Sequence, residues 1–293
     1  MRFILIGANG QLGTDLREVL PPDTLGLDWP EFDVRRSDQV RDVLRRHRPD
    51  FVINCAAQTN VDLCEGEEGE AFTVNALGAL NVARGAEEVG ATALYVSTDY
   101  VFGADTRRTE PYTEDDSPGP INVYGASKLA GEHLTAAYNA RACVVRTCGL
   151  YGHAGARGKG GNFVETMLRL AAEGKPIRVV DDQKLSPTST AACARRIHEL
   201  CERRVQGLVH VAARDACTWF DFARAIFEHQ MIDVDLKPIR SSEYPVRARR
   251  PSASALRSKR LNQIGVAMYG SWREMLHEYL TTRSVRRNGV RQA

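Results

Sequence analysis

Short apolar runs alternate with amphipathic stretches through the first half of the chain. The apolar runs predict strands at Arg2–Gly7, Thr24–Leu27, Phe51–Asn54, Ala93–Ser97 and Ala142–Arg146. The amphipathic stretches predict helices at Gln11–Leu20, Val40–His47, Ala71–Val89 and Val123–Tyr138. Strands that alternate with helices indicate βαβ units, and apolar runs without strict alternation are typical of a parallel sheet covered on both faces. The pattern therefore predicts an α/β domain with a doubly wound parallel sheet over residues 1–151.

The pattern changes after Tyr151. Five glycines in Gly152–Gly161 predict a mobile loop, and Gly103–Pro120 is also predicted to be a loop. A smaller C-terminal α/β lobe that binds substrate is expected at 152–282, interleaved with the first domain. Its predicted helices and strands are Asn162–Glu173, Ile177–Val180, Ala191–Arg204, Leu208–Val211, Thr218–Glu228 and Trp272–Leu280. Residues 283–293 are rich in arginine and predict a basic, flexible tail.

A glycine-rich turn, Gly7-Ala-Asn-Gly10-Gln-Leu-Gly13, connects the first predicted strand to the first predicted helix. Glycines let the backbone approach a pyrophosphate closely, and the amide groups at a helix N-terminus face the anion. In this position the turn is typical of a dinucleotide-binding site, which makes the first domain Rossmann-type.

Acidic side chains follow the second predicted strand. Asp28 closes that strand about 20 residues past the turn, where dinucleotide-binding domains carry a ribose-binding acid. Such an acid accepts hydrogen bonds from the adenosine ribose and favours NAD over NADP. Asp33 is a second candidate for the adenosine end. Ala56 and Ala57, after the third strand, are small enough for the cofactor to lie against the sheet edge.

A tyrosine and a lysine four residues apart, Tyr124 and Lys128, share one face of a predicted helix. An ammonium group near a phenol favours the phenolate and lowers the pKa of the phenol. Such a tyrosine can pass a proton to a carbonyl oxygen as hydride reaches the carbon, and the lysine can also hold the cofactor ribose. Thr98, at the end of the fourth predicted strand, can hydrogen-bond the same oxygen. These residues predict a carbonyl reductase that uses NADPH or NADH.

The composition is that of an ordinary globular protein. The chain has 293 residues, of which 43% are hydrophobic, and its formal net charge of +2 gives no indication of a nucleic-acid partner. The apolar run Phe3–Ile6 is too short for a signal peptide or a membrane span. The seven cysteines are scattered without a Cys-x-x-Cys pair, which argues against disulfides and a zinc site. A cytoplasmic protein without membrane contact is expected.

Seven stretches together resemble the extended short-chain dehydrogenase/reductase family, and within it the dTDP-4-dehydrorhamnose reductases. They are spread over nearly the whole chain: Gly7–Gly13, Arg48–Ala57, Ser97–Phe102, Asn122–Glu132, Gly161–Leu168, Val180–Thr188 and Tyr244–Pro251. The resemblance implies NAD(P)H-dependent reduction of the 4-keto group of a nucleotide-linked deoxysugar, above all dTDP-4-dehydrorhamnose to dTDP-L-rhamnose.

The resemblance also implies roles for individual residues. Tyr124 would be the proton donor, with Lys128 as its partner and Thr98 at the reacting oxygen. The implied cofactor-binding residues are Gly7, Gly10, Gln11, Leu12, Gly13, Asp28, Asp33, Val34, Ala56, Ala57, Thr59, Tyr124 and Lys128. The implied substrate-binding residues, of which the last two would hold the nucleotide diphosphate, are Thr98, Asp99, Tyr100, Asn162 and Arg250.

Other functions remain open on the sequence alone. Dehydratases of this superfamily carry Asp-Glu after the threonine, whereas this chain has Asp99-Tyr100, which argues against a dehydratase. An epimerase uses the same tyrosine and lysine and stays an alternative. A different class of protein is a non-catalytic NAD(P)-binding regulatory subunit, like the β subunit of methionine adenosyltransferase.

Two positions depart from the family pattern. Gly149 stands where the reductases carry a tryptophan that packs against substrate, so either another side chain fills the space or the substrate differs. The adjacent Gly152–Gly161 segment is a candidate lid. Some relatives bind Mg²⁺ through glutamates at a dimer contact; the nearest position here is Asp15, a shorter carboxylate, so Mg²⁺ is unsupported and no metal site is predicted. A homodimer is left open.

Overall fold

The centre of the molecule is a parallel six-stranded sheet with the order β10-β5-β4-β3-β1-β2. The computed structural model describes residues 1–155, 161–267 and 270–290. The strands of the sheet are β1 (Phe3–Ile6), β2 (Leu25–Leu27), β3 (Phe51–Asn54), β4 (Thr92–Thr98), β5 (Cys143–Thr147) and β10 (Gly207–His210). The predicted doubly wound parallel sheet is confirmed.

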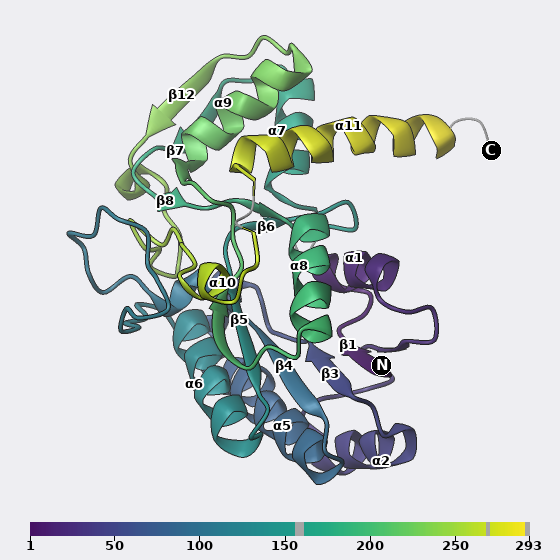
Figure 1. Cartoon of the computed structure of the whole chain (residues 1–293). Helices are drawn as coiled ribbons and strands as arrows, with labels where there is room; N and C mark the ends of the chain where they lie inside the picture. The colour runs from purple at the N-terminus through teal and green to yellow at the C-terminus, as the bar shows by residue number, and fades with distance from the viewer. Residues whose placement is uncertain (156–160, 268–269, 291–293) are drawn as a thin grey trace.

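Helices cover both faces of this sheet (Figure 1). The first helix, α1 (Gln11–Val19), shares one face with α8 (Thr190–Glu202), while α2 (Ser37–His47), α5 (Gly78–Glu88) and α6 (Val123–Tyr138) cover the other. Successive side chains along a strand point to opposite faces of the sheet, so adjacent residues pack in different cores. Leu5 packs in a cluster with residues of α1 and α8, whereas Ile4 packs with residues of α2 and α5.

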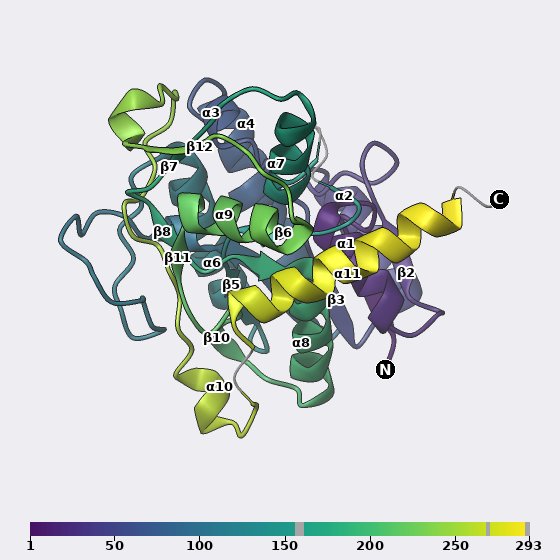
Figure 2. The same cartoon turned by 90° about the horizontal axis from the view of Figure 1, so that it is seen from above.

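The second half of the chain builds a separate lobe and also completes the sheet. The lobe contains α7 (Phe163–Ala172), β7 (Ile177–Val180), α9 (Trp219–Gln230), β12 (Leu236–Ile239) and α11 (Trp272–Val290), which lie together above the sheet in Figures 1 and 2. Short paired strands join the two parts: β6 (Leu150–Tyr151) with β9 (Thr188–Ser189), and β8 (Lys184–Leu185) with β11 (Cys217–Thr218). Between them the chain returns to the sheet as α8 and β10.

Two helices differ from the sequence prediction. The helix expected at Ala71–Val89 begins earlier, as α4 (Glu68–Phe72), and passes through a wide π-helical turn at Thr73–Leu77 before α5. The last helix does not end near Leu280 but continues as α11 to Val290, while the flexibility of residues 283–293 stays a prediction. A reason lies in Arg283, whose guanidinium pairs with Glu165 of α7 (2.6 Å) and holds the helix against the lobe. Residues 291–293 of the predicted tail, like 156–160 of the predicted loop, lie outside the described residues.

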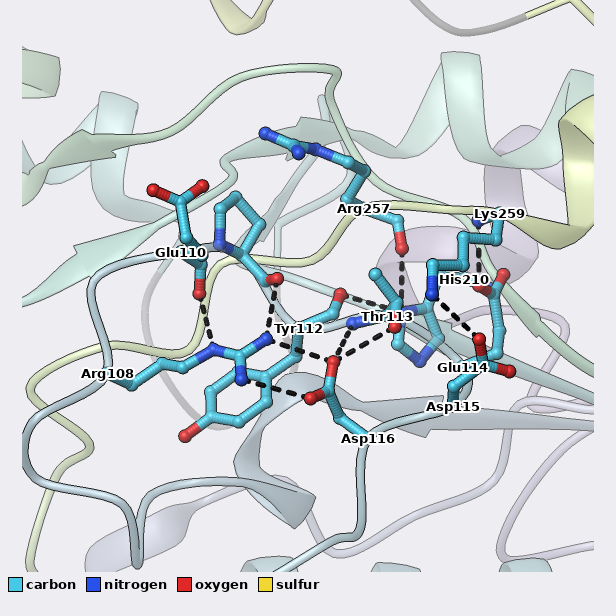
Figure 3. A network of polar contacts seen from close by, with 11 residues as sticks. Arg108, Glu110, Tyr112, Thr113, Glu114, Asp115, Asp116, His210, Arg257 and Lys259 are labelled. Atoms are coloured by element: carbon cyan, nitrogen blue, oxygen red, sulfur yellow. Dashed lines mark hydrogen bonds and ion pairs between the residues drawn. The ribbon is translucent and has the colours of Figure 1, made fainter.

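The predicted loop Gly103–Pro120 has little regular structure but is tightly attached (Figure 3). The Glu114 carboxylate accepts a hydrogen bond from the backbone N–H of His210 (2.9 Å), which Figure 3 shows. It also accepts one from Ser258 Oγ (2.5 Å). Tyr112 exchanges backbone hydrogen bonds with Ala255 and Arg257. The loop thereby joins the end of β10 to the segment after residue 250. Four short helices complete the described part of the fold: α3 (Val61–Cys64), α10 (Arg260–Gln263) and 3₁₀ turns at Asp99–Val101 and Ser241–Glu243.

The seven cysteines are all free thiols, as their spacing predicts. Within the described residues, no helix combines the length and the apolar character needed to span a bilayer.

Candidate active site

A cavity of about 920 Å³ lies at the carboxyl ends of β1, β3, β4 and β5 and extends under the second lobe. The chain runs from β1 to β2 on one side and then to β3 on the other side of β1, so the strand order reverses at this point. Open α/β sheets bind ligands at such a reversal. The two ends of the cavity are lined by different groups.

The glycine turn lines the cavity floor and has no room for side chains. Gly7 has φ +78°, and a Cβ there would lie 3.0 Å from the backbone of Ala56. A Cβ on Gly13 would lie 2.1 Å from the carbonyl oxygen of Gly7. No side chain caps the N-terminus of α1, and Gly10, Gln11 and Leu12 border the cavity. This cradle fits a pyrophosphate because the backbone can come close and the helix N-terminus attracts an anion.

Acidic residues define the end of the cavity near β2. Asp28 lines the cavity, and its carboxylate accepts hydrogen bonds from the backbone N–H groups of Asn9 (2.7 Å) and Trp29 (2.8 Å). Asp33 and Val34 line the same end. Arg35 hydrogen-bonds Asp33 (2.6 Å) and holds the pKa of that carboxyl below its usual value. Two fixed carboxylates at the strand end suit the hydroxyl groups of an adenosine ribose.

The segment after β3 borders the cavity and is supported by a residue that the sequence analysis missed. Ala56, Ala57 and Thr59 all line the cavity. Asn75, in the π-helical turn, is fully buried; its side chain accepts from Gln58 N–H (2.8 Å) and donates to Ser127 Oγ (2.9 Å). Asn75 therefore fixes the segment to α6. A lone asparagine inside a helical pattern gives no signal of this role.

Tyr124 and Thr98 lie together in the cavity. Tyr124 is in the first turn of α6, which is capped by the Asn122 side chain through Gly125 N–H (2.7 Å). Burial raises the pKa of the Tyr124 phenol above its ordinary value, and a hydrogen bond with Thr98 lowers it in part. Tyr100 packs edge-on against Tyr124, with ring centroids 5.9 Å apart. The two hydroxyl groups predicted to grip one carbonyl oxygen are thus brought together.

Lys128 is buried one turn further along α6. Its Nζ donates to the carbonyl oxygen of Val96 (2.7 Å) and lies 4.0 Å from the centre of the Tyr95 ring. Burial lowers the pKa of the ammonium group to about 7, against the opposing influence of Glu132. Burial dominates the pKa of both groups, and the expectation that Lys128 lowers the pKa of Tyr124 stays a prediction.

A buried ion pair lies behind Lys128 and was not predicted. Arg146 of β5 pairs with Glu132 of α6 (2.6 Å), and Ser97 Oγ donates to the same carboxylate (2.5 Å). The Arg146 Nη1 group is buried without a partner in the described residues. Breaking a buried pair is costly, so the pair fixes the distance between α6 and the sheet.

The residues predicted to hold substrate have different surroundings. Asp99 lines the cavity and accepts a hydrogen bond from Ser254 Oγ (2.5 Å); burial raises the pKa of its carboxyl to about 6. Asn162 also lines the cavity, but its amide is used within the protein: it caps α7 and donates to the Gly152 carbonyl (2.7 Å). Arg250 pairs with Asp62 (2.8 Å) and is not among the described residues that line the cavity. The diphosphate contacts implied for Asn162 and Arg250 are therefore not preformed.

Gly149 shows how the space of the absent tryptophan is used. The residue has φ +51°, and a Cβ there would lie 2.7 Å from Leu185 Cδ1. Leu185 thus occupies the space beside Gly149, and the left-handed backbone disfavours any larger residue.

Asp15, the position compared with the metal-binding glutamates, is buried on α1 and accepts a hydrogen bond from Thr190 of α8. Among the described residues, no group of three or more potential metal ligands is found. Asp15 therefore joins α1 to α8.

Comparison with known proteins identifies close relatives over the full length of the chain. A dTDP-4-dehydrorhamnose reductase of Mycolicibacterium smegmatis is 39% identical over 282 residues, covering 94% of this chain and 84% of the relative. The spore coat polysaccharide biosynthesis protein SpsK of Bacillus subtilis is 36% identical, covering 97% and 98%. The crystal structure of dTDP-4-dehydrorhamnose reductase from Bacillus anthracis in complex with NADP has a TM-score of 0.91 and 40% identity, covering 96% and 99%.

More distant structures share the fold. A UDP-glucose 4-epimerase of Thermus thermophilus in complex with NAD superposes with a TM-score of 0.79 at 20% identity, which shows the fold alone. The family model described as the RmlD substrate binding domain matches residues 1–285. Together with the relatives and the Thr98–Tyr124–Lys128 arrangement, this match places the chain in the RmlD substrate binding domain family of NAD(P)-dependent oxidoreductases.

Proposed function

We propose that this protein reduces the 4-keto group of dTDP-4-dehydrorhamnose to give dTDP-L-rhamnose, with NADPH or NADH as the reductant. The observation that carries the proposal is the convergence of Thr98 and Tyr124 in one cavity with the glycine cradle. The names of the full-length relatives support the substrate.

The residues of the chain divide the work of the reduction. Thr98 and Tyr124 hydrogen-bond the keto oxygen and orient the carbonyl. A nicotinamide bound in the cavity would supply the hydride that reaches the carbonyl carbon. As the oxygen gains negative charge, Tyr124 donates its phenolic proton to it, and the hydroxyl product forms. The raised pKa of Tyr124 keeps the phenol protonated before reaction, which suits a proton donor. Lys128 holds the cofactor ribose.

The alternatives have less support. An epimerase must move hydride in both directions on a retained cofactor. The Thermus thermophilus epimerase is 20% identical to this chain, whereas several full-length reductases match at 35–40%. A purely regulatory subunit has no need of a buried tyrosine beside a strand-end threonine.

Replacing Tyr124 by phenylalanine tests the proposal. Tyr124→Phe is expected to lower kcat by about 10²–10⁴-fold, the usual contribution of a positioned proton donor, while NADPH binding stays unchanged. Absorbance at 340 nm with dTDP-4-dehydrorhamnose measures the first, and fluorescence titration with NADPH the second. The matched control is Tyr138→Phe, an exposed tyrosine at the other end of the same helix. Near wild-type turnover by Tyr124→Phe would contradict the mechanism.

We further propose that the protein is cytoplasmic, which fits seven free thiols. A homodimer stays a prediction, for which light scattering behind size-exclusion chromatography is the test.

A further inference from the structure

An aromatic side chain outside the catalytic group, Trp219, borders the cavity. It is half-buried at the first position of α9. The Phe163 ring packs against it, with centroids 4.5 Å apart, and Phe222 contacts both rings. The indole is therefore supported by aromatic rings of the lobe, and it lines the cavity together with Phe163.

The backbone at Trp219 is firmly held. Thr218 caps α9 in a reciprocal arrangement, since its hydroxyl accepts from Asp221 N–H (3.0 Å) and the Asp221 carboxylate accepts from Thr218 N–H (3.3 Å). The Thr218 hydroxyl also donates to Asp181 (2.7 Å) at the end of β7. A side chain on such a base keeps its position without a ligand, which lowers the entropic cost of binding.

Trp219 lies toward the catalytic end of the cavity, away from the acidic residues near β2. It packs against an apolar cluster that includes Cys148 and Leu185. Leu185 occupies the space beside Gly149, and Cys148 contacts the Asp99 carboxylate next to Thr98. A continuous set of contacts thus leads from the reacting position to the indole. Gly149 contributes no side chain here, and Trp219 is, with Phe163 and Leu185, one of the large apolar side chains that line the cavity.

We propose that Trp219 is the wall on which the sugar ring of the nucleotide-sugar packs, and that it favours 6-deoxysugars through contact with their methyl group. The inference rests on the proposed function for the identity of the substrate. An indole face matches the C–H face of a pyranose ring and a methyl substituent, both of which gain by leaving water. A 6-hydroxyl group at the same place would lose hydrogen bonds to water without replacing them.

Binding measurements test the wall independently of turnover. Calorimetric titrations with dTDP and with dTDP-L-rhamnose, both in the presence of NADP⁺, measure the gain in affinity due to the sugar. Wild-type protein is expected to bind dTDP-L-rhamnose more tightly than dTDP. In Trp219→Ala this gain falls by about tenfold, the effect of removing a large apolar contact, while the affinity for dTDP changes less than about twofold. Trp219→Phe, which keeps an aromatic ring and the fold, retains most of the gain. Tyr138→Ala, an exposed aromatic outside the cavity, is the matched control.

The possible results separate the wall from the proposed reaction. Equal losses for dTDP and dTDP-L-rhamnose in Trp219→Ala would mean that the indole contacts the base, and would overturn the proposal. The proposal would also be overturned if Trp219→Ala still bound dTDP-L-rhamnose more tightly than dTDP by the wild-type factor. It would be overturned as well if wild-type protein bound the two ligands with equal affinity. If wild-type protein fails to reduce dTDP-4-dehydrorhamnose but the sugar gain disappears in Trp219→Ala, the proposed reaction fails and the wall stands.

Discussion

For individual side chains in the cavity, burial influences the protonation state more than neighbouring charges do. Asp99 is the clearest example, because its carboxyl is buried between Ser254 and Thr98 and has no cation among its hydrogen-bond partners in the described residues. Desolvation disfavours the charged form and raises the pKa to about 6. Asp99 follows a strand end and lines the cavity, but its burial and hence its protonation cannot be derived from sequence spacing.

This raised pKa predicts a pH dependence of stability. The folded protein binds the Asp99 proton more tightly than the unfolded chain does, so stability from this group is fully present below about pH 4 and is lost as pH rises through about 6. Asp99→Asn does not titrate; its amide oxygen still accepts from Ser254, whereas its NH₂ group replaces the oxygen that accepts from the Thr98 hydroxyl. We expect the variant to exceed wild type in free energy of unfolding by about 1–3 kcal/mol at pH 7.5, with a smaller difference at pH 4.

Urea unfolding at both pH values measures the difference. Ser254→Ala, which removes one hydrogen bond but leaves the carboxyl, should keep the pH dependence. Parallel pH profiles for wild type and Asp99→Asn would contradict the assignment.

At the scale of elements, the hydrophobic pattern predicted most of the helices and most of the strands. The strands of the sheet are buried on both faces and therefore appear as short apolar runs. The pattern missed the features that depend on contacts between distant segments. The π-helical turn at Thr73–Leu77 has an ordinary helical pattern, yet it directs Asn75 toward Gln58 and Ser127. The strand at Leu208–Val211 was predicted, but its place beside β5 follows only from the fold. The attachment of Arg283 to Glu165 likewise gives no local signal.

The return of α8 to the sheet predicts a specific loss of stability. Ile197 is fully buried between α8 and the core that contains Leu5 and Leu16. Ile197→Ala removes three carbon atoms there, and a loss of about 2–5 kcal/mol in the free energy of unfolding is expected. Urea unfolding followed by circular dichroism measures it. Arg195→Ala on the exposed face of the same helix, which breaks only an exposed pair with Glu278, should cost less than about 1 kcal/mol. Similar values for the two variants would show that α8 is not part of the main core.

On the scale of the whole molecule, the cavity depends on both halves of the chain. The glycine turn, Thr98 and Tyr124 line it from the sheet domain, and Leu185 and Trp219 line it from the second half of the chain. The halves are not independent, because the cluster on one face of the sheet combines Leu16 and Val145 with Ile197, Val209 and Leu261. The sequence pattern thus changes at residue 151, but the hydrophobic core contains residues from both sides of this boundary.

This shared core predicts that a fragment of residues 1–151 does not fold cooperatively. Without α8 and β10, the apolar faces of α1 and β5 are exposed to water, and β5 becomes an unprotected edge of the sheet. Circular dichroism should show helix content without a sharp thermal transition, and the fragment should bind an apolar dye that the intact protein does not bind. Adding separately produced residues 152–293 supplies the missing helix and strand, so a cooperative transition should return on mixing. A sharp transition in the 1–151 fragment alone would mean that the sheet domain is a complete folding unit and that the second half only adds the lobe.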